Sequence, residues 1–188
     1  MRGREHTRLI GGIVALVVIV GAWWAWPGDR GADVAGPPGS ARVVEVVDGD
    51  TLRVQVDGTT ETVRLLGIDT PETRHPTKPV ECFGAEASER LAELAPAGAV
   101  VRLERDVEAR DHYDRLLAYI YVTGGDGTEV LANTSMVADG YAVALAIDPN
   151  RAHRSEIAAL EQQARASAAG LWGACGGPGV AVDAVTGR

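Results

Sequence analysis

The chain has 188 residues, enough for one domain of ordinary size and an appended segment. Apolar residues make up 46% and charged residues 23%, which excludes a collagen-like or wholly disordered chain. Aromatic residues contribute only 5%, so the core must be built from Val, Leu, Ile and Ala. The net charge of −8 excludes a strongly basic protein that attracts phosphate groups over its whole surface.

The first 27 residues are set apart by their hydropathy. Arg2, Arg4 and Arg8 precede an uncharged apolar run over residues 9–26. A helix of these 18 residues would nearly span a bilayer, for which about 20 residues are usual. The run is longer than the apolar core of a signal peptide, which has roughly 7–15 residues. Three tryptophans at the far end suit the membrane interface, and the arginines favour an N-terminus kept in the cytoplasm. We therefore expect residues 1–27 to be a membrane anchor that exports the rest. A cleaved signal peptide and a buried helix of a soluble protein are the alternatives.

Two further segments lack any periodic pattern. Residues 28–41 are rich in Gly, Ala and Pro, which predicts a flexible linker, and residues 176–188 are expected to be a disordered tail. The folded domain then occupies residues 42–175. Cys82 and Cys175 form an even pair in an exported chain, which favours a disulfide, with two free buried thiols as the alternative. The bond would close a loop of about 93 residues and stabilise the fold by roughly 4–5 kcal/mol.

Strand and helix patterns follow one another in a definite order within the folded domain. Three β-branched runs separated by Asp-Gly turns predict strands over residues 43–47, 51–56 and 60–66. The later segments predict a helix over 83–95, strands over 100–103 and 116–122, and helices over 131–139 and 153–169. This order predicts an α+β domain that is mainly β: a five-stranded OB-type barrel with about three appended helices. Other α+β folds stay open.

Acidic residues gather at two turns of the predicted barrel. Asp48 and Asp50 lie between the first two strands, and Asp69 and Glu72 follow the third. Because both loops can lie at the same end of the barrel, their carboxylates can converge on a hard cation such as Ca²⁺ or Mg²⁺. The alternative is that Asp-Gly and Asp-Thr are simply good turn formers. The pattern matches neither an EF-hand loop nor a glycine-rich phosphate-binding loop.

Two arginines stand beside apolar strands. Arg64 precedes Leu-Leu-Gly-Ile, and Arg115 precedes Leu-Leu-Ala-Tyr. A guanidinium at the end of such a strand can hold phosphate oxygens through two parallel hydrogen bonds. Taken alone, each arginine is more simply explained as a strand residue that faces solvent.

The folded domain resembles the staphylococcal-nuclease (thermonuclease) family in five segments that occur in the same order and at matching spacings: VVDGDTLRV, VRLLGIDTPET, ECFGAEA, DHYDRLLAYIY and GLW. The likeness covers about residues 43–172, nearly the whole folded domain. The family implies an OB-type barrel, in agreement with the strand pattern. It also implies Ca²⁺-dependent hydrolysis of DNA and RNA that leaves 3′-phosphate ends.

By position, the resemblance implies a role for each residue of the family's catalytic set. The implied calcium ligands are the carboxylates of Asp50 and Asp69 and the backbone carbonyl of Thr70. Glu72 matches the glutamate that positions and deprotonates the attacking water. Arg64 and Arg115 match the arginines that bind the phosphate and stabilise the charged transition state. Such groups are needed because negative charge grows on the phosphate as it is attacked.

The sequence departs from the family in its substrate-binding residues. Two tyrosines near the substrate base are replaced by Leu145 and Ile147, whereas Tyr113 keeps its match and can contact a phosphate. Residues 41–175 carry 13 Lys and Arg against 22 Asp and Glu, a net charge of −9. We therefore expect weaker and more salt-sensitive binding of nucleic acid than the catalytic set alone would suggest.

The leading hypothesis is a monomeric, exported, Ca²⁺-dependent endonuclease, tethered to the membrane through residues 9–26. Its substrates would be single-stranded or locally melted DNA and RNA. One alternative is a barrel that binds nucleic acid or calcium without cleaving, and another is an envelope domain that uses calcium only for stability. Substitution of Glu72, Arg64 or Arg115 would favour these alternatives, but all three residues are present.

Overall fold

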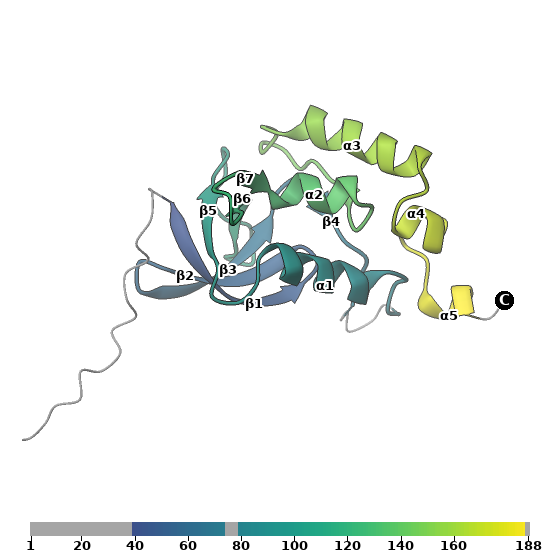
Figure 1. Ribbon diagram of the computed structural model, residues 1–188, viewed down its shortest axis with the longest axis horizontal. Coiled ribbons are helices and arrows are strands. Elements are labelled where there is room, and N and C mark those ends of the chain that lie inside the picture. Colours follow the sequence, from purple (N-terminus) through teal and green to yellow (C-terminus); the bar gives the residue numbers. More distant parts are fainter. Residues whose placement is uncertain (1–38, 74–78, 187–188) are drawn as a thin grey trace, which may run out of the picture. The chain divides into compact units, whose positions relative to one another are not determined.

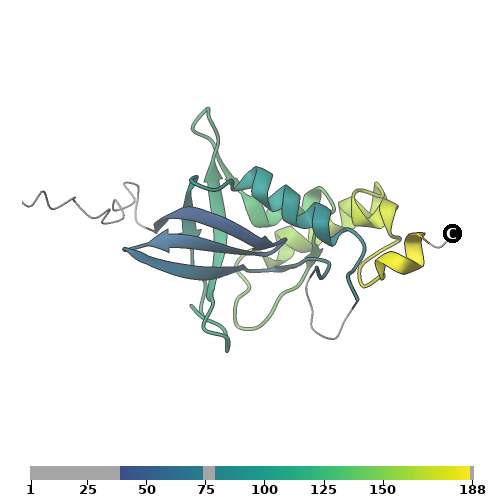
Figure 2. The ribbon, with the colours of Figure 1, turned by 90° about the horizontal axis from the view of Figure 1, so that it is seen from below.

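The computed structural model describes residues 39–73 and 79–186. Five strands form a closed mixed barrel (Figures 1 and 2): β1 Ser40–Asp48, β2 Thr51–Val56, β3 Thr59–Leu65, β5 Val100–Glu104 and β6 Leu116–Thr123. They lie in the order β3-β2-β1-β5-β6 with antiparallel neighbours, and a parallel pairing of β3 with β6 closes the barrel. The five strands expected from the sequence are confirmed, and each overlaps its predicted range.

Side chains alternate along the strands between the barrel interior and its outside. In β2, Leu52 and Val54 are fully buried, whereas Arg53 between them is exposed. β3 follows the same alternation, which places Arg64 between two buried aliphatic residues. Register shifts bend β1, so that its start pairs with β5 and the rest pairs with β2. The core is therefore mainly aliphatic, as the low aromatic content predicted.

Five helices lie in the described residues: α1 Gly84–Leu94, α2 Ala132–Ala138, α3 Arg154–Ala166, α4 Leu171–Ala174 and α5 Val182–Thr186. The first three confirm the helices that the sequence predicted. The sequence does not predict α4 and α5, because four or five residues are too few to show helical periodicity. Three strands are likewise too short to be predicted from the sequence: β4 Ile68–Asp69, β7 Glu129–Leu131 and β8 Val143–Ala144. β7 extends the sheet beside β6, and β4 pairs with β8.

The helices cover the barrel in layers. α1 packs against β1 and α2, and α3 lies over α2 (Figure 1). Their fully buried apolar side chains include Ala87, Leu91 and Met136. The fully buried Asn133 of α2 accepts a hydrogen bond from the Ile120 backbone NH at 2.9 Å and donates one to the Leu66 carbonyl at 2.8 Å. This one amide therefore fixes α2 to β6 and to the turn after β3.

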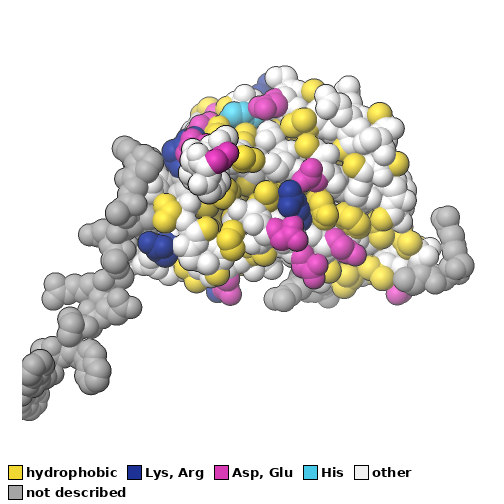
Figure 3. Space-filling view, viewed as in Figure 1, with side chains coloured by type: hydrophobic (Ala, Val, Ile, Leu, Met, Phe, Trp, Pro, Cys, Tyr) yellow, Lys and Arg dark blue, Asp and Glu magenta, His cyan; other side chains and the backbone are white. Residues whose placement is uncertain are grey.

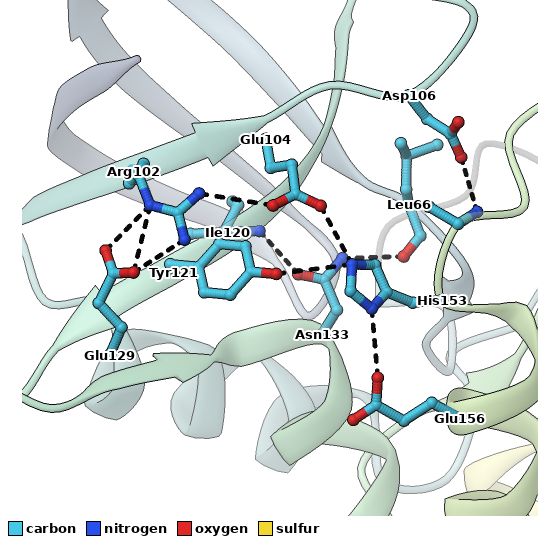
Figure 4. Close-up of polar contacts among 11 residues, drawn as sticks. Leu66, Arg102, Glu104, Asp106, Ile120, Tyr121, Glu129, Asn133, His153 and Glu156 are labelled. Carbon is cyan, nitrogen blue, oxygen red and sulfur yellow. Dashed lines mark hydrogen bonds and ion pairs between the residues drawn. The ribbon is translucent and has the colours of Figure 1, made fainter. Parts of the chain in front are cut away.

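A network of charged residues joins the barrel to the start of α3 (Figure 4). We call it the His153 cluster, and its members are Arg102, Glu104, Tyr121, Glu129, His153 and Glu156. The two ring nitrogens of His153 lie 3.1 Å from a carboxylate oxygen of Glu104 and 3.2 Å from one of Glu156. Burial has the largest single effect on the pKa of His153 and lowers it. The hydrogen bonds and charges of the two glutamates outweigh burial and raise this pKa overall.

The expected disulfide between Cys82 and Cys175 is confirmed, with Cα atoms 6.0 Å apart. The sequence predicted a disordered tail after it, whereas the structure pairs Ala181 with Glu81 in an antiparallel bridge and forms α5 beyond. The predicted anchor lies outside the described residues, as does most of the predicted linker. Within residues 39–73 and 79–186, no helix is long and apolar enough to cross a membrane.

Candidate active site

The turn between β1 and β2 brings two carboxylates to one end of the barrel. The Asp48 carboxylate accepts a hydrogen bond from the Asp50 backbone NH at 3.2 Å, and Asp50 is only 6% exposed. Gly49 lets this turn pack closely, because a Cβ there would lie 2.8 Å from the Ala87 Cβ and 2.9 Å from the Thr70 Cβ. The turn can therefore rest against α1 and Thr70 only because residue 49 has no side chain.

Arg64, near the end of β3, is held by both backbone and carboxylate oxygens. Its NH1 donates to the carbonyls of Leu65 and Ile68, each at 2.8 Å. Its NH2 lies 2.9 Å from an oxygen of Asp50 and 2.9 Å from an oxygen of Asp69. The guanidinium is thus held in one orientation and links the turn between β1 and β2 to the end of β4.

The residues at and after β4 supply the next part of the site. Asp69 ends β4, and the Thr70 backbone NH donates to Asp50 at 3.2 Å. Glu72 follows two residues later, in a stretch that packs against the start of α1. A Cβ on Gly84 would lie 3.3 Å from the Glu72 carbonyl oxygen. A small residue at the start of α1 therefore allows the close approach of the stretch that carries Glu72.

Arg115 lies immediately before β6 and is fixed by Asp111. One carboxylate oxygen of Asp111 accepts from the Arg115 Nε at 2.8 Å, and the other accepts from its backbone NH at 3.0 Å. Burial has the largest single effect on the pKa of Asp111 and raises it, but these hydrogen bonds outweigh burial and lower the pKa. Tyr113 is 69% exposed, and its ring centre lies 5.3 Å from the Arg115 guanidinium carbon. Arg115 is therefore oriented before any ligand arrives.

One cavity of about 230 Å³, which we call the acidic cavity, is lined by Asp48, Asp50, Arg64, Asp69, Thr70, Pro71, Glu72, Thr73 and Arg115. Burial and then the charge of Asp50 raise the pKa of Asp48 to about 6. Burial also raises the pKa of Asp69. The charge of Arg64 opposes this rise, and the charges of three neighbouring carboxylates add to it. The lining therefore carries more negative charge than its two arginines neutralise.

The donor atoms of the acidic cavity fit a hard divalent cation. The carboxylates of Asp50 and Asp69 and the carbonyl of Thr70 are oxygen donors of the kind that Ca²⁺ prefers, and no histidine or cysteine is among the lining residues. In the described part of the chain, no three Asp, Glu, His or Cys side chains are gathered as a preformed metal cluster. The NH2 of Arg64 instead contacts both aspartates. Because the pKa values of Asp48 and Asp69 are raised, a further positive charge would stabilise the ionised forms of these two carboxyl groups.

A larger cavity of about 690 Å³ adjoins the acidic cavity and shares Arg64 and Arg115 with it. Leu145 and Ile147 form part of its wall, and Ile147 is 66% exposed. Asn150 also lines it and is buried. The two arginines therefore stand between a charged cavity and a partly aliphatic one.

The protein surface over α1 and α2 is acidic on one face. On the face shown in Figure 3, Asp and Glu side chains gather over α1 and α2 with few Lys or Arg side chains among them. Arg90 of α1 pairs with Asp139 at 2.8 Å and with Glu93 at 2.9 Å. Ion pairs of this kind reduce the basic surface that is free to attract phosphates.

Comparison with known proteins identifies the family. Residues 62–174 match the family model described as "Staphylococcal nuclease homologue". The chain belongs to the staphylococcal nuclease family. The matched residues include five of the predicted site residues that line the acidic cavity: Arg64, Asp69, Thr70, Glu72 and Arg115. The resemblance inferred from the sequence is therefore confirmed, and family membership indicates a nuclease.

Individual relatives agree with this assignment. The chain is 34% identical over 165 residues to the thermonuclease of Staphylococcus intermedius, an alignment that covers 85% of this chain and 94% of that protein. It is 35% identical over 131 residues to the thermonuclease of Staphylococcus hyicus, covering 70% and 74% of the two chains. It is 39% identical over 127 residues to the SPbeta prophage-derived endonuclease YokF of Bacillus subtilis (strain 168), covering 67% of this chain. That last alignment spans only 41% of YokF.

The structure brings six predicted site residues into one cavity: Asp50, Arg64, Asp69, Thr70, Glu72 and Arg115. Their chemical roles stay predictions. Tyr113 does not line that cavity and lies exposed beside Arg115. Sequence reasoning missed Asp111, although its spacing of four residues before Arg115 was visible. It also missed Glu81, whose carboxylate accepts the Glu72 backbone NH at 3.2 Å and whose only signal was its place in the ECFGAEA segment.

Proposed function

We propose that the chain is a Ca²⁺-dependent endonuclease that hydrolyses phosphodiester bonds of DNA and RNA and leaves 3′-phosphate ends. The observation that carries the proposal is the acidic cavity. A glutamate and two oriented arginines line it together with three aspartates, of which Asp50 is buried. This combination supplies a proton acceptor, phosphate-binding groups and cation ligands within one small volume.

The arginines would bind the phosphate at the attacked bond. Arg64 is oriented by two backbone carbonyls and Arg115 by Asp111, so neither has to be ordered again when charge develops. Donors oriented in this way stabilise a transition state more than they stabilise the ground state. Glu72 would accept the proton of the attacking water, because neither the cation nor Arg64 is expected to engage it, whereas the carboxylate of Asp48 accepts the Asp50 backbone NH.

The carboxylates of Asp50 and Asp69 and the carbonyl of Thr70 would hold Ca²⁺. When bound, the ion would polarise the phosphate and lower the pKa of a water molecule. Arg64 NH2 contacts both aspartates at 2.9 Å. We expect this nitrogen to exchange the carboxylates for phosphate oxygens once they share a divalent charge, while NH1 keeps its two carbonyl partners. Asp48 would support the turn that carries Asp50, through its hydrogen bond to the Asp50 backbone NH.

The larger cavity would take the nucleotide beside the attacked phosphate, since it shares both arginines with the acidic cavity. Leu145 and Ile147 can contact a base but cannot stack on it as an aromatic ring would. We therefore expect modest affinity, little base preference and strong salt dependence. Single-stranded or locally melted DNA and RNA would suit this site, with the protein acting as a monomer.

We also propose that this OB-type barrel acts outside the cytoplasm, tethered through residues 9–26. The Cys82–Cys175 disulfide supports that location, because such bonds persist mainly in oxidising compartments. Fractionation of cells that express the full chain, followed by thiol alkylation, tests it. We expect a membrane-bound protein without free thiols, and a reduced protein in the cytoplasmic fraction would contradict the proposal.

Cleavage of a labelled single-stranded oligonucleotide by the purified full chain tests the catalytic proposal. DNA and RNA versions are incubated in Ca²⁺ and in EGTA with the wild type, with Glu72→Gln and with Glu89→Gln, a control on the exposed side of α1. We expect cleavage only in Ca²⁺, a loss of roughly 10²- to 10⁴-fold in Glu72→Gln, and wild-type rates in the control. Full activity in EGTA or in Glu72→Gln would overturn the mechanism. Binding of the oligonucleotide without any cleavage would identify a binding module instead.

A further inference from the structure

Glu81 holds the backbone of Glu72 from both sides. The Glu81 carboxylate accepts the Glu72 backbone NH at 3.2 Å, and the Glu81 backbone NH donates to the Glu72 carbonyl at 2.9 Å. These two residues therefore join the two ends of the segment that begins after β4 and ends at α1. The orientation of Glu72 toward the acidic cavity depends on where Glu81 lies.

The C-terminal segment in turn holds Glu81. The Cys82 backbone NH donates to the Val180 carbonyl at 2.7 Å, and the Val182 NH donates to the Val80 carbonyl at 3.1 Å. Between these bonds Ala181 pairs with Glu81 in an antiparallel bridge. The Cys82–Cys175 disulfide joins the same two segments covalently. We call residues 175–182 together with this disulfide the C-terminal clamp.

The C-terminal clamp also borders the predicted ligand residues. A cavity of about 330 Å³ lies between them, lined by Asp69, Thr70, Pro71, Glu81, Val143, Pro178 and Gly179. The clamp residues Pro178 and Gly179 thus face the residues proposed to hold the cation. Two backbone hydrogen bonds are a weak restraint on a half-exposed segment, because ordering each residue costs conformational entropy. The covalent bond at Cys82 keeps the segment close enough to pair.

We propose that the C-terminal clamp positions Glu72 through Glu81, which makes Glu81 a positioning residue for the cleavage reaction. The inference rests on the proposed function of Glu72 as proton acceptor. A displaced Glu72 would still leave both arginines and the two aspartates in place to bind substrate. The clamp therefore affects turnover and leaves substrate binding largely unchanged.

Substitution at Glu81 tests the link to Glu72. Glu81→Ala removes the acceptor oxygen, Glu81→Gln keeps one, and Glu89→Ala is the control in the same region of the chain. For Glu81→Ala we expect kcat on single-stranded DNA to fall roughly 10- to 100-fold, with KM close to wild type. Amide exchange at Glu72 should quicken as well. Glu81→Gln should restore most of both properties, and Glu89→Ala should change neither. Wild-type kcat in Glu81→Ala, or an equal loss in Glu81→Gln, would overturn the inference.

Two altered chains and one control chain test the C-terminal clamp itself. A chain ending at Gly177 keeps the disulfide but loses the pairing with residues 80–82, and a chain ending at Thr186 keeps both. The double variant Cys82→Ser with Cys175→Ser keeps the segment but loses the bond. We expect kcat to fall roughly 10-fold, and amide exchange at Glu72 to become faster, in the chain ending at Gly177 and in the double cysteine variant. The circular dichroism spectrum of the chain ending at Gly177 should be unchanged. The chain ending at Thr186 should match the wild type.

These measurements separate the two proposals. If the wild type does not cleave in Ca²⁺, the proposed function fails, and amide exchange at Glu72 still reports whether the C-terminal clamp holds it. If the wild type cleaves and the chain ending at Gly177 keeps the same kcat and exchange rate, the inference about the clamp fails alone. A rise in KM with unchanged kcat in that chain would also overturn it, because the clamp would then act on substrate binding.

Discussion

The acidic cavity and the His153 cluster both combine carboxylates with arginines, yet the shifts in carboxyl pKa have opposite signs in the two regions. In the His153 cluster, a hydrogen bond from His153 has the largest effect on Glu104 and lowers its pKa. Arg102 likewise lowers the pKa of Glu129. In the acidic cavity, burial and neighbouring carboxylates raise the pKa of Asp48 and of Asp69. A lowered carboxyl pKa marks an ion pair that stabilises the charged form, and a raised one marks desolvated, crowded negative charge that its neighbours do not fully neutralise. The first arrangement stabilises a fold, whereas the second is suited to bind a cation.

The largest expected difference between the two regions is in catalysis. Arg64→Gln removes a guanidinium from the acidic cavity, and Arg102→Gln removes one from the His153 cluster. We expect Arg64→Gln to lower kcat/KM for single-stranded DNA by roughly 10²- to 10³-fold, because an oriented donor to the developing charge is lost. Arg102→Gln should keep nearly full activity. Steady-state cleavage in saturating Ca²⁺ measures both, and equal losses in the two variants would erase the distinction.

The effect of calcium on the free energy of unfolding should also distinguish the acidic cavity from the His153 cluster. A ligand that binds only the folded state at 100 times its Kd stabilises by about 2.7 kcal/mol. We expect urea unfolding of the wild type in excess Ca²⁺ to show a gain of that order, and Asp50→Asn to abolish most of it. Glu104→Gln is the matched control and should retain the gain. A calcium-dependent gain that survives in Asp50→Asn would place the cation elsewhere.

Close packing around the acidic cavity gives a further test. A Cβ on Gly84 would lie 2.8 Å from the Thr73 Cγ2 and 3.3 Å from the Glu72 carbonyl oxygen. Gly84→Ala should therefore displace the segment that carries Glu72 and cost about 1–3 kcal/mol of unfolding free energy through overpacking. It should also lower kcat. Gly125→Ala is the control, since a Cβ there would meet nothing within 4 Å. Unchanged kcat in Gly84→Ala would mean that this packing does not fix Glu72.

The two regions differ in how far sequence could predict them. Alternating β-branched residues and Asp-Gly turns, which are local signals, predict the barrel strands. Arg64 and Asp69 lie in specific motifs, so the resemblance to a family located them without geometry. The positions of the two turns also predict that Asp50 converges with them, but the close packing that Gly49 permits against Ala87 and Thr70 is encoded by no local pattern.

The His153 cluster left no comparable signal in the sequence. His153 is separated by 49 positions from Glu104, and the pairing of Arg102 with Glu129 spans 27 positions. Such contacts exist only once β5, β6 and α3 have packed, because each partner is an ordinary surface residue in its own segment. The sequence predicts only a tail in the C-terminal segment for the same reason. Its contacts are backbone hydrogen bonds to residues 80–82, and backbone groups have no sequence signature.

The smallest expected effect is a pH dependence of stability that belongs to the His153 cluster. His153 contacts Glu104 from β5 and Glu156 from α3, and the rings of Tyr119 and Tyr121 face it from β6. Its pKa in the folded protein lies above the unfolded value of about 6.5. The stabilisation is therefore fully present below about pH 6.5 and is lost as the pH rises through the folded pKa.

We expect His153→Gln to remove this pH dependence while leaving cleavage unchanged. The size should be at most about 1 kcal/mol, because water screens the two partly exposed glutamates. The measurement is the difference in unfolding free energy between wild type and His153→Gln from pH 5 to pH 9. Taking the difference cancels the carboxyl groups of the acidic cavity, which titrate in both proteins. A difference that grew with rising pH would have the wrong sign for a histidine held between two carboxylates, and it would mean that burial governs His153.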